Sequence, residues 1–144
     1  MKASRLYHQA ILEAASARTG EGELEHRHAR AVVDNPLCGD RVRVDVMVSG
    51  GRVERVAHEV RGCLLCQAAA SVIGEEAPGE GVQALIELAP ALRAFLTDET
   101  LKPPQLWPAL EMFAPVAKHK SRHDCVMLPF DALVEALQKC EVSG

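Results

Sequence analysis

Apolar residues recur with two different periods along the chain, and the two periods predict different elements. Residues 5–18 place apolar side chains three and four positions apart, which is typical of an amphipathic helix. Residues 41–49 read RVRVDVMVS, with a valine at every second position, which predicts a strand with one buried face. The Gly50-Gly51 pair suits a tight turn. Residues 52–60 are therefore expected to return as the partner strand of an antiparallel hairpin.

Two further features refine this hairpin and what precedes it. Alternation is lost between Val53 and Val56 in the returning strand, which indicates a β-bulge. Residues 29–34 predict a short strand that ends before Pro36, because the residue before a proline is pushed out of the helical region. The polar segment 20–28 predicts a flexible connection from the first helix to this strand.

The second half of the chain has mainly helical spacing. Residues 63–75 and 81–97 predict two helices, the second kinked or divided by Pro90. Residues 106–114 predict a short helix, and residues 129–139 predict a last helix that begins at a proline and follows a basic loop. The order of elements predicts an α+β fold in which a small antiparallel β-sheet of about three strands packs against several α-helices.

Composition adds limits on the class of protein. A chain of 144 residues with 48% hydrophobic residues is sufficient for one core, so we expect a single domain spanning residues 1–144. The net charge is −4 and the basic residues are dispersed, so nucleic acid is not an expected partner. The N-terminus has no apolar stretch of signal-peptide or membrane-spanning length. We therefore expect a soluble cytoplasmic protein without a membrane partner.

The cysteines provide the candidate chemistry. Five is an odd number, and a reducing compartment disfavours structural disulfides, so metal binding or thiol chemistry becomes the main alternative to burial. Cys38 and Cys63 stand at equal distances before and after the hairpin turn, so pairing of the strands brings them together. Gly39 allows the backbone to bend so that Cys38 and Asp40 converge. Cys125, ahead of the last predicted helix, completes a set of four ligands.

Three sulfurs and one oxygen suit tetrahedral zinc, and they also suit iron during cluster construction. The carboxylate of Asp40 binds iron or an iron–sulfur cluster less firmly than a fourth thiolate would. This site is therefore expected to release a bound metal or cluster more readily. Simple burial is the alternative for each cysteine taken alone, because free cysteine behaves as a small apolar residue. Cys140, in the last helix, is interpreted as a packed thiol without a role.

Cys63 and Cys66 form a CxxC pair at the start of a predicted helix, where the free amide hydrogens favour the Cys63 thiolate. Such a pair can share a metal, hold a transient disulfide or pass sulfur between thiols. Cys66 is thus an alternative ligand that would compete with Asp40. The other interpretation is that Cys66 packs inward beside Ala69.

These motifs resemble the NifU-like iron–sulfur cluster assembly scaffolds, the family that includes the IscU and SufU proteins. The resemblance covers nearly the whole chain, and the matching stretches are NPLCGD (35–40), Gly-Cys with AAAS following (62–71), CVML (125–128) and LYHQAIL (6–12). It implies an IscU/SufU-like fold and a scaffold or sulfur acceptor, whose enzyme status stays open. It also implies that Cys38, Asp40, Cys63 and Cys125 hold Zn²⁺ or a transient 2Fe–2S cluster.

The two branches of the family imply different details. The long stretch between Ser71 and Cys125, together with Arg122, is similar to the SufU branch. That branch implies a zinc site in which Cys38, freed by ligand exchange, accepts persulfide sulfur from a cysteine desulfurase. The IscU branch implies a cluster scaffold with Cys125 as the persulfide receiver. Both imply a cysteine desulfurase and recipient apo-proteins of clusters as partners.

The chain departs from the IscU pattern next to the last cysteine. Asp124 stands where that branch has a histidine, and His123 is the nearest substitute. Residues 114–118 match the chaperone-recognition segment only loosely, so chaperone recruitment is not expected.

Two functions of other classes remain as alternatives. A dithiol redox protein would use Cys63 and Cys66, although the hairpin before Cys63 differs from the βαβ setting of thioredoxin-like sites. A zinc-stabilised interaction domain would hold the same metal without any turnover.

Overall fold

The computed structural model describes residues 2–36 and 39–143, and it has the predicted α+β architecture. The elements follow in the order α1 (Lys2–Ala17), β1 (Ala29–Asn35), β2 (Asp40–Ser49), β3 (Arg52–Arg61), α2 (Leu64–Glu76), α3 (Val82–Thr97), η1 (Pro108–Lys118), η2 (Lys120–Arg122) and α4 (His123–Ser143). Here η1 and η2 are 3₁₀ helices.

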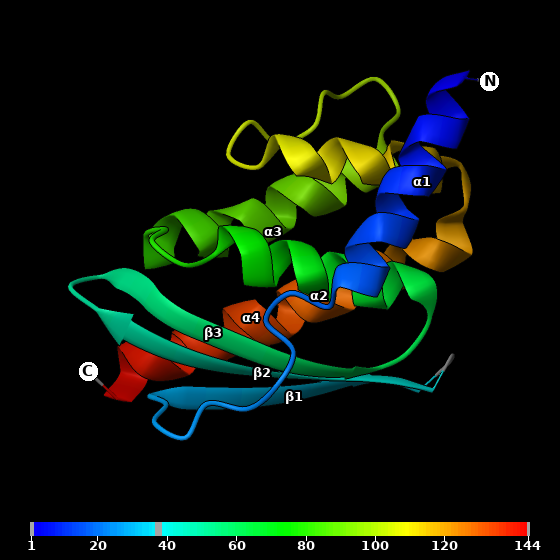
Figure 1. The fold of residues 1–144 in the computed structure, drawn as a ribbon. Helices are drawn as coiled ribbons and strands as arrows, with labels where there is room; N and C mark the ends of the chain where they lie inside the picture. Colours follow the sequence, from blue (N-terminus) through cyan, green and yellow to red (C-terminus); the bar gives the residue numbers. More distant parts are fainter. Residues whose placement is uncertain (1, 37–38, 144) are drawn as a thin grey trace.

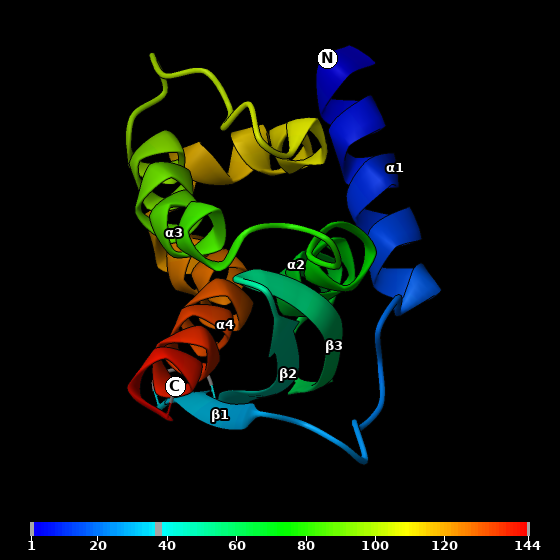
Figure 2. The same cartoon turned by 90° about the vertical axis from the view of Figure 1, so that its left-hand side faces the viewer.

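The sheet has three antiparallel strands in the order β1-β2-β3, which confirms the predicted sheet. It forms one layer of the molecule, and the helices form the other (Figure 1). Seen from the side, α4 lies next to the sheet, with α2 between the sheet and α1 (Figure 2). Within the described ranges, no helix is both long and apolar enough to cross a bilayer.

The predicted bulge is present and changes the register of the hairpin. Val48 pairs with Val53 but Met47 pairs with Arg55, so Glu54 is the extra residue on β3. The shifted register continues to the Arg41–Arg61 pair at the other end of the strands. One step further, Asp40 lies against Gly62, immediately before Cys63.

The alternating valines of β2 form the sheet side of the core. Val42, Val44 and Val46 are completely buried, as the pattern predicts, beneath α4. Trp107 and Phe130 pack together on the helical side, with ring centroids 6.0 Å apart. The hydrophobic residues therefore form one continuous core between the sheet and the helices.

Two of the α-helices contain a proline, and of these α3 has nearly its predicted extent whereas α4 begins earlier than predicted. α3 runs through Pro90 without being divided. α4 begins at His123, six residues before the proline expected to start it, and this places Cys125 in its first turn. Pro129 costs the helix one hydrogen bond, but Val126, Met127 and Leu128 are buried in the core, and their packing outweighs that loss.

The segment between α1 and β1 is tied to the outer face of the sheet by a buried carboxylate. Asp45 of β2 is completely buried there and accepts hydrogen bonds from Arg30 Nε at 2.6 Å and from the Leu24 amide at 3.1 Å. Burial, the largest influence, raises the pKa of Asp45, but the hydrogen bonds from Arg30 and Leu24 and the charge of Arg43 outweigh it. The pKa of Asp45 is therefore lowered from its ordinary value.

Asp45→Asn is expected to lower the free energy of unfolding by about 2 kcal/mol at pH 7, because a buried charge-assisted pair is lost. A carboxyl whose pKa is lower in the folded state stabilises the fold above its unfolded pKa, and this contribution is lost as pH falls through the folded pKa. The difference in free energy of unfolding between wild type and Asp45→Asn should thus become smaller below about pH 4. Urea unfolding at several pH values measures it. Asp34→Asn, at an exposed ion pair with Arg41, is the control and should change little. An equal deficit at every pH would contradict the assignment.

Candidate metal centre

Three segments far apart in sequence meet at one end of the sheet. Asp40 is the first residue of β2, Cys63 directly precedes α2, and Cys125 lies in the first turn of α4. One carboxylate oxygen and the two Sγ atoms all lie within 4.8 Å of one another. Among the described residues, no other group of three or more His, Cys, Asp or Glu side chains is arranged in this way.

Cys63 is placed by the start of α2. Its backbone is extended (φ −73°, ψ 173°), and its carbonyl accepts a hydrogen bond from the Gln67 amide at 3.0 Å, which starts the helix. Its side chain makes no capping hydrogen bond, and the residue is half-buried. The thiol is therefore held at the surface without being used to cap the helix.

The Asp40 carboxylate is buried with one oxygen that lacks a hydrogen-bond partner among the described residues. The residue is 6% exposed, and the oxygen without a partner is Oδ2. Burying a carboxylate oxygen without a partner is costly, and a bound cation offsets that cost. The orphaned oxygen, beside two cysteine sulfurs, fits a zinc or iron site.

Gly62 leaves the space that the Asp40 carboxylate occupies. A Cβ at position 62 would lie 2.9 Å from Asp40 Cγ and 3.1 Å from each carboxylate oxygen. The sequence identified Gly62 only as part of the family motif. The cross-strand register is what assigns it this steric role.

Cys125 is 9% exposed, and its neighbours in sequence are engaged elsewhere. Asp124 is exposed, and its Oδ1 lies 3.8 Å from Arg93 Nη1 of α3. His123 Nε2 lies 3.1 Å from the carbonyl oxygen of Val116 and 3.2 Å from that of Ala117, so it acts as a hydrogen-bond donor to η1. Cys125 is thus the residue of this turn that joins the site.

The remaining cysteines divide into three cases. Cys38 lies outside the described residues. Cys66 is completely buried in the core and is not part of the group of three side chains. Cys140 is half-buried on α4, where burial raises the pKa of its thiol. The roles of Cys38 and Cys66 as ligands stay predictions.

Comparison with known proteins adds the family context. The model of the "NifU-like N terminal domain" matches residues 6–141. The iron–sulfur cluster assembly scaffold protein IscU of Thermotoga maritima is 27% identical over 93% of this chain and 94% of its own length. The zinc-dependent sulfurtransferase SufU of Bacillus subtilis is 26% identical over 94% of this chain and 92% of its own length.

Solved structures agree with this result. The N-terminal part of a nitrogen-fixing NifU-like protein from Brucella abortus is 31% identical, covers 96% of both chains and superimposes with a TM-score of 0.89. A SufU-type scaffold from Fervidobacterium islandicum AW-1, at 23% identity and a TM-score of 0.81 over 90% of this chain and 94% of its own, shares the fold. Relatives of the IscU and SufU types match with almost equal identity, so the predicted preference for the SufU branch receives no support from identity.

Proposed function

Because the chain belongs to the NifU-like N-terminal domain family, we propose that it acts in iron–sulfur cluster assembly, as a scaffold or as a sulfur acceptor. The observation that carries this proposal is the meeting of Asp40, Cys63 and Cys125 around an orphaned carboxylate oxygen. Neither a simple buried core nor a dithiol site needs a carboxylate between two cysteines.

In this proposal, Cys38, Asp40, Cys63 and Cys125 are the ligands of Zn²⁺ or of a 2Fe–2S cluster carried as cargo. Cys38 stands two residues before Asp40, so the chain allows its thiol to reach the same site. Zinc, when bound, keeps its cysteine ligands deprotonated at neutral pH. The protein's own contribution is to hold a carboxylate and thiolates from separate elements at one point.

Sulfur transfer needs an accessible thiolate on this chain. The thiolate of Cys38 or Cys125 attacks the outer sulfur of a persulfide on the desulfurase. A new S–S bond forms on the acceptor, the S–S bond of the donor persulfide breaks, and the donor cysteine leaves as a thiolate with the electron pair. Cys66 is less suited to this step, because it is fully buried and exchange at its sulfur requires local opening of the core.

We further propose that residues 1–144 form a single cytoplasmic domain whose partners are a cysteine desulfurase and the apo-proteins that receive clusters. The family match over residues 6–141 and the continuous core support the single domain. The stretch between Ser71 and Cys125, here built from α3 and η1, and the exposed Arg122 support placement nearer the SufU type. Placement with the SufU type would make zinc the occupant, and placement with the IscU type would make it a 2Fe–2S cluster.

The first test is metal analysis and absorbance of the anaerobically purified protein, with the variants Cys63→Ser and Cys125→Ser. Wild type is expected to bind zinc or a coloured cluster stoichiometrically, and each variant is expected to lose at least about tenfold in metal affinity through the loss of a ligand. Cys140→Ser is the matched control and should retain the metal, because its thiol lies outside the group of three. A wild-type protein that is stable and binds no metal would contradict the proposal.

The same variants separate the competing functions when they are added to a cysteine desulfurase. Sulfide release should rise with wild type and fall with Cys38→Ala or Cys125→Ala. A zinc-bound protein that never changes sulfide release would favour a structural zinc domain. Cys66→Ser should retain the coupling, and its loss in that variant would favour the dithiol function.

A further inference from the structure

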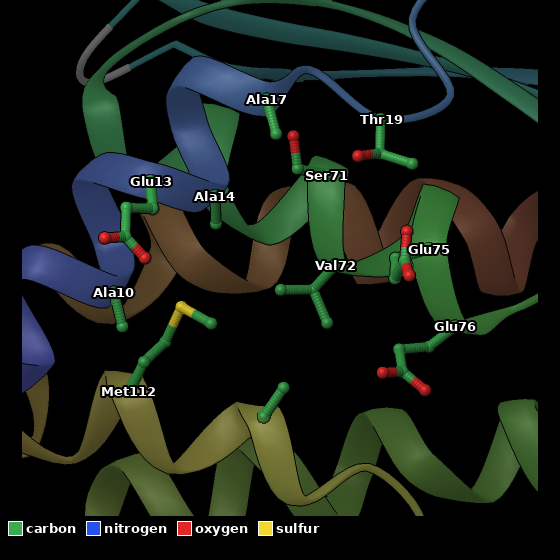
Figure 3. A pocket seen from close by; sticks show the side chains of 11 residues that line it. Ala10, Glu13, Ala14, Ala17, Thr19, Ser71, Val72, Glu75, Glu76 and Met112 are labelled. Carbon is green, nitrogen blue, oxygen red and sulfur yellow. The ribbon is translucent and has the colours of Figure 1, made fainter.

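A pocket lies apart from the metal-binding side chains, between α1, α2 and η1 (Figure 3). Its volume is about 350 Å³, within the range that accommodates small organic ligands. No residue of the candidate metal centre lines it. The pocket is therefore separate from the metal centre, and all the charged side chains that line it are acidic.

Three carboxylates border the pocket, from Glu13 of α1 and from Glu75 and Glu76 of α2. Glu13 accepts a hydrogen bond from Gln9, and none of the three forms an ion pair within the described ranges. No lysine, arginine or histidine lines the pocket. Like charges gathered without counter-charges favour a cationic occupant.

A buried hydroxyl gives independent evidence for a missing partner. Ser71 of α2 is 3% exposed, and its Oγ has no hydrogen-bond partner among the described residues. Its side chain lies in the wall of the pocket and extends from α2 toward Ala17 of α1 (Figure 3). An unpaired buried hydroxyl is costly, and a ligand that donates a hydrogen bond to it offsets the cost.

The remaining wall is mainly apolar. Val72 and Met112 face each other across the space, with Ala10 and Ala14 on the α1 side (Figure 3). Small side chains on α1 leave room for a slender stem, and the thioether of Met112 adapts to its shape. A carboxylate rim above an apolar wall matches a ligand with one charged end and one apolar end.

We propose that this pocket binds a free alkylammonium, a primary amine on an apolar stem of about four to six carbons. The ammonium has three donors: the Ser71 hydroxyl accepts one hydrogen bond and one carboxylate of the rim accepts another, while the other carboxylates attract the charge at longer range. The stem lies along Val72 and Met112. A bare metal ion fits less well. The three carboxylates do not come within 4.8 Å of one another as a metal-binding group of the described residues would.

The test uses n-hexylammonium as the probe and the metal-loaded full-length protein, followed by ¹H–¹⁵N chemical shifts. Saturable shifts are expected for amides lining the pocket on α1, α2 and η1, and they should weaken with added salt. 1-Hexanol has the same stem without the charge and should bind at least about tenfold more weakly. Equal binding of both probes, or no saturable shift in the pocket, would overturn the proposal.

Variants assign the contacts. Glu13→Gln and Glu76→Gln should each weaken hexylammonium binding by about two- to fivefold, because each removes one partly exposed charge. Ser71→Ala should weaken it by a similar factor through the lost hydroxyl. Glu87→Gln, at an exposed acid of α3, is the matched control and should bind like wild type. Unchanged binding in all three pocket variants would overturn the assignment, and equal loss in Glu87→Gln would reduce it to general electrostatic attraction.

The source of the ammonium is decided by a second probe. The peptide Gly-Lys-Gly, blocked at both ends, presents the same ammonium on a peptide backbone. Stronger binding of hexylammonium than of the peptide supports a free amine, whereas binding of the peptide alone would overturn that choice in favour of a lysine from a partner protein. Metal content should be unchanged in every pocket variant, so this proposal fails or holds independently of the proposed function.

Discussion

Replacing Gly62 with alanine is expected to reduce metal affinity by about ten- to a hundredfold while leaving the fold almost unchanged. The added Cβ would lie 2.9 Å from Asp40 Cγ, closer than real Cβ contacts allow. The clashing atoms belong to the end of a side chain, so Asp40 can rotate away at little cost to the backbone. The carboxylate would then leave the position in which it lies within 4.8 Å of the sulfurs of Cys63 and Cys125.

Two measurements on Gly62→Ala separate a local effect from a general one. Metal affinity is obtained by competition with a chromophoric chelator, and stability of the metal-free protein by urea unfolding. Gly81→Ala is the matched control, because a Cβ there meets nothing within 4 Å, and it should bind metal like wild type. If Gly62→Ala kept wild-type affinity, Asp40 would not be a ligand in the position found here.

Replacing Gly74 with alanine is expected to lower the free energy of unfolding by about 3 kcal/mol. Gly74 lies within α2, where alanine is intrinsically the better helix former by about 1 kcal/mol. However, its Cβ would overlap the carbonyl oxygen of Thr19 and lie 2.6 Å from the carbonyl carbon. These are backbone atoms, so the chain after α1 must move away from α2, and the 2.7 Å hydrogen bond between Thr19 O and His58 Nε2 is disturbed.

Two opposing effects act on the stability of Gly74→Ala, and the clash between backbones is expected to outweigh the gain in helix propensity. Local helix propensity alone predicts a more stable variant, and the close crossing of two backbones predicts a less stable one. Urea unfolding of the metal-free protein measures the difference. Gly81→Ala, at the N-cap of α3, should cost about 1 kcal/mol or less. An unchanged or increased stability in Gly74→Ala would mean that the chain after α1 does not cross α2 at Gly74 this closely.

The local patterns predicted most of the elements correctly. The valines of β2 and the glycine pair after them defined the hairpin, and the lost alternation between Val53 and Val56 located the bulge near Glu54. These features depend on backbone conformation and side-chain spacing over a few residues, so they are present in the sequence itself. The candidate ligands Asp40, Cys63 and Cys125 were also recognisable, because each lies beside a turn or the end of an element.

Longer-range packing decided the features that were missed. The start of α4 at His123 could not be predicted from Pro129, because burial of the residues before the proline depends on the sheet and α2. Asp45 looked like a solvent-facing position of an alternating strand. It is buried because the segment after α1 returns across that face, and Arg30 compensates its charge.

The sequence alone thus determined an antiparallel hairpin, its flanking helices and a set of residues able to bind a metal, because short-range periodicity and residue chemistry suffice for these. Only the tertiary structure decided that Asp40 lies against Gly62 beside two sulfurs, and that Ser71 and three glutamates surround a separate pocket. Both sites are built from segments that are distant in sequence. Their distances are set by how the sheet and the helices pack, and no local pattern contains that information.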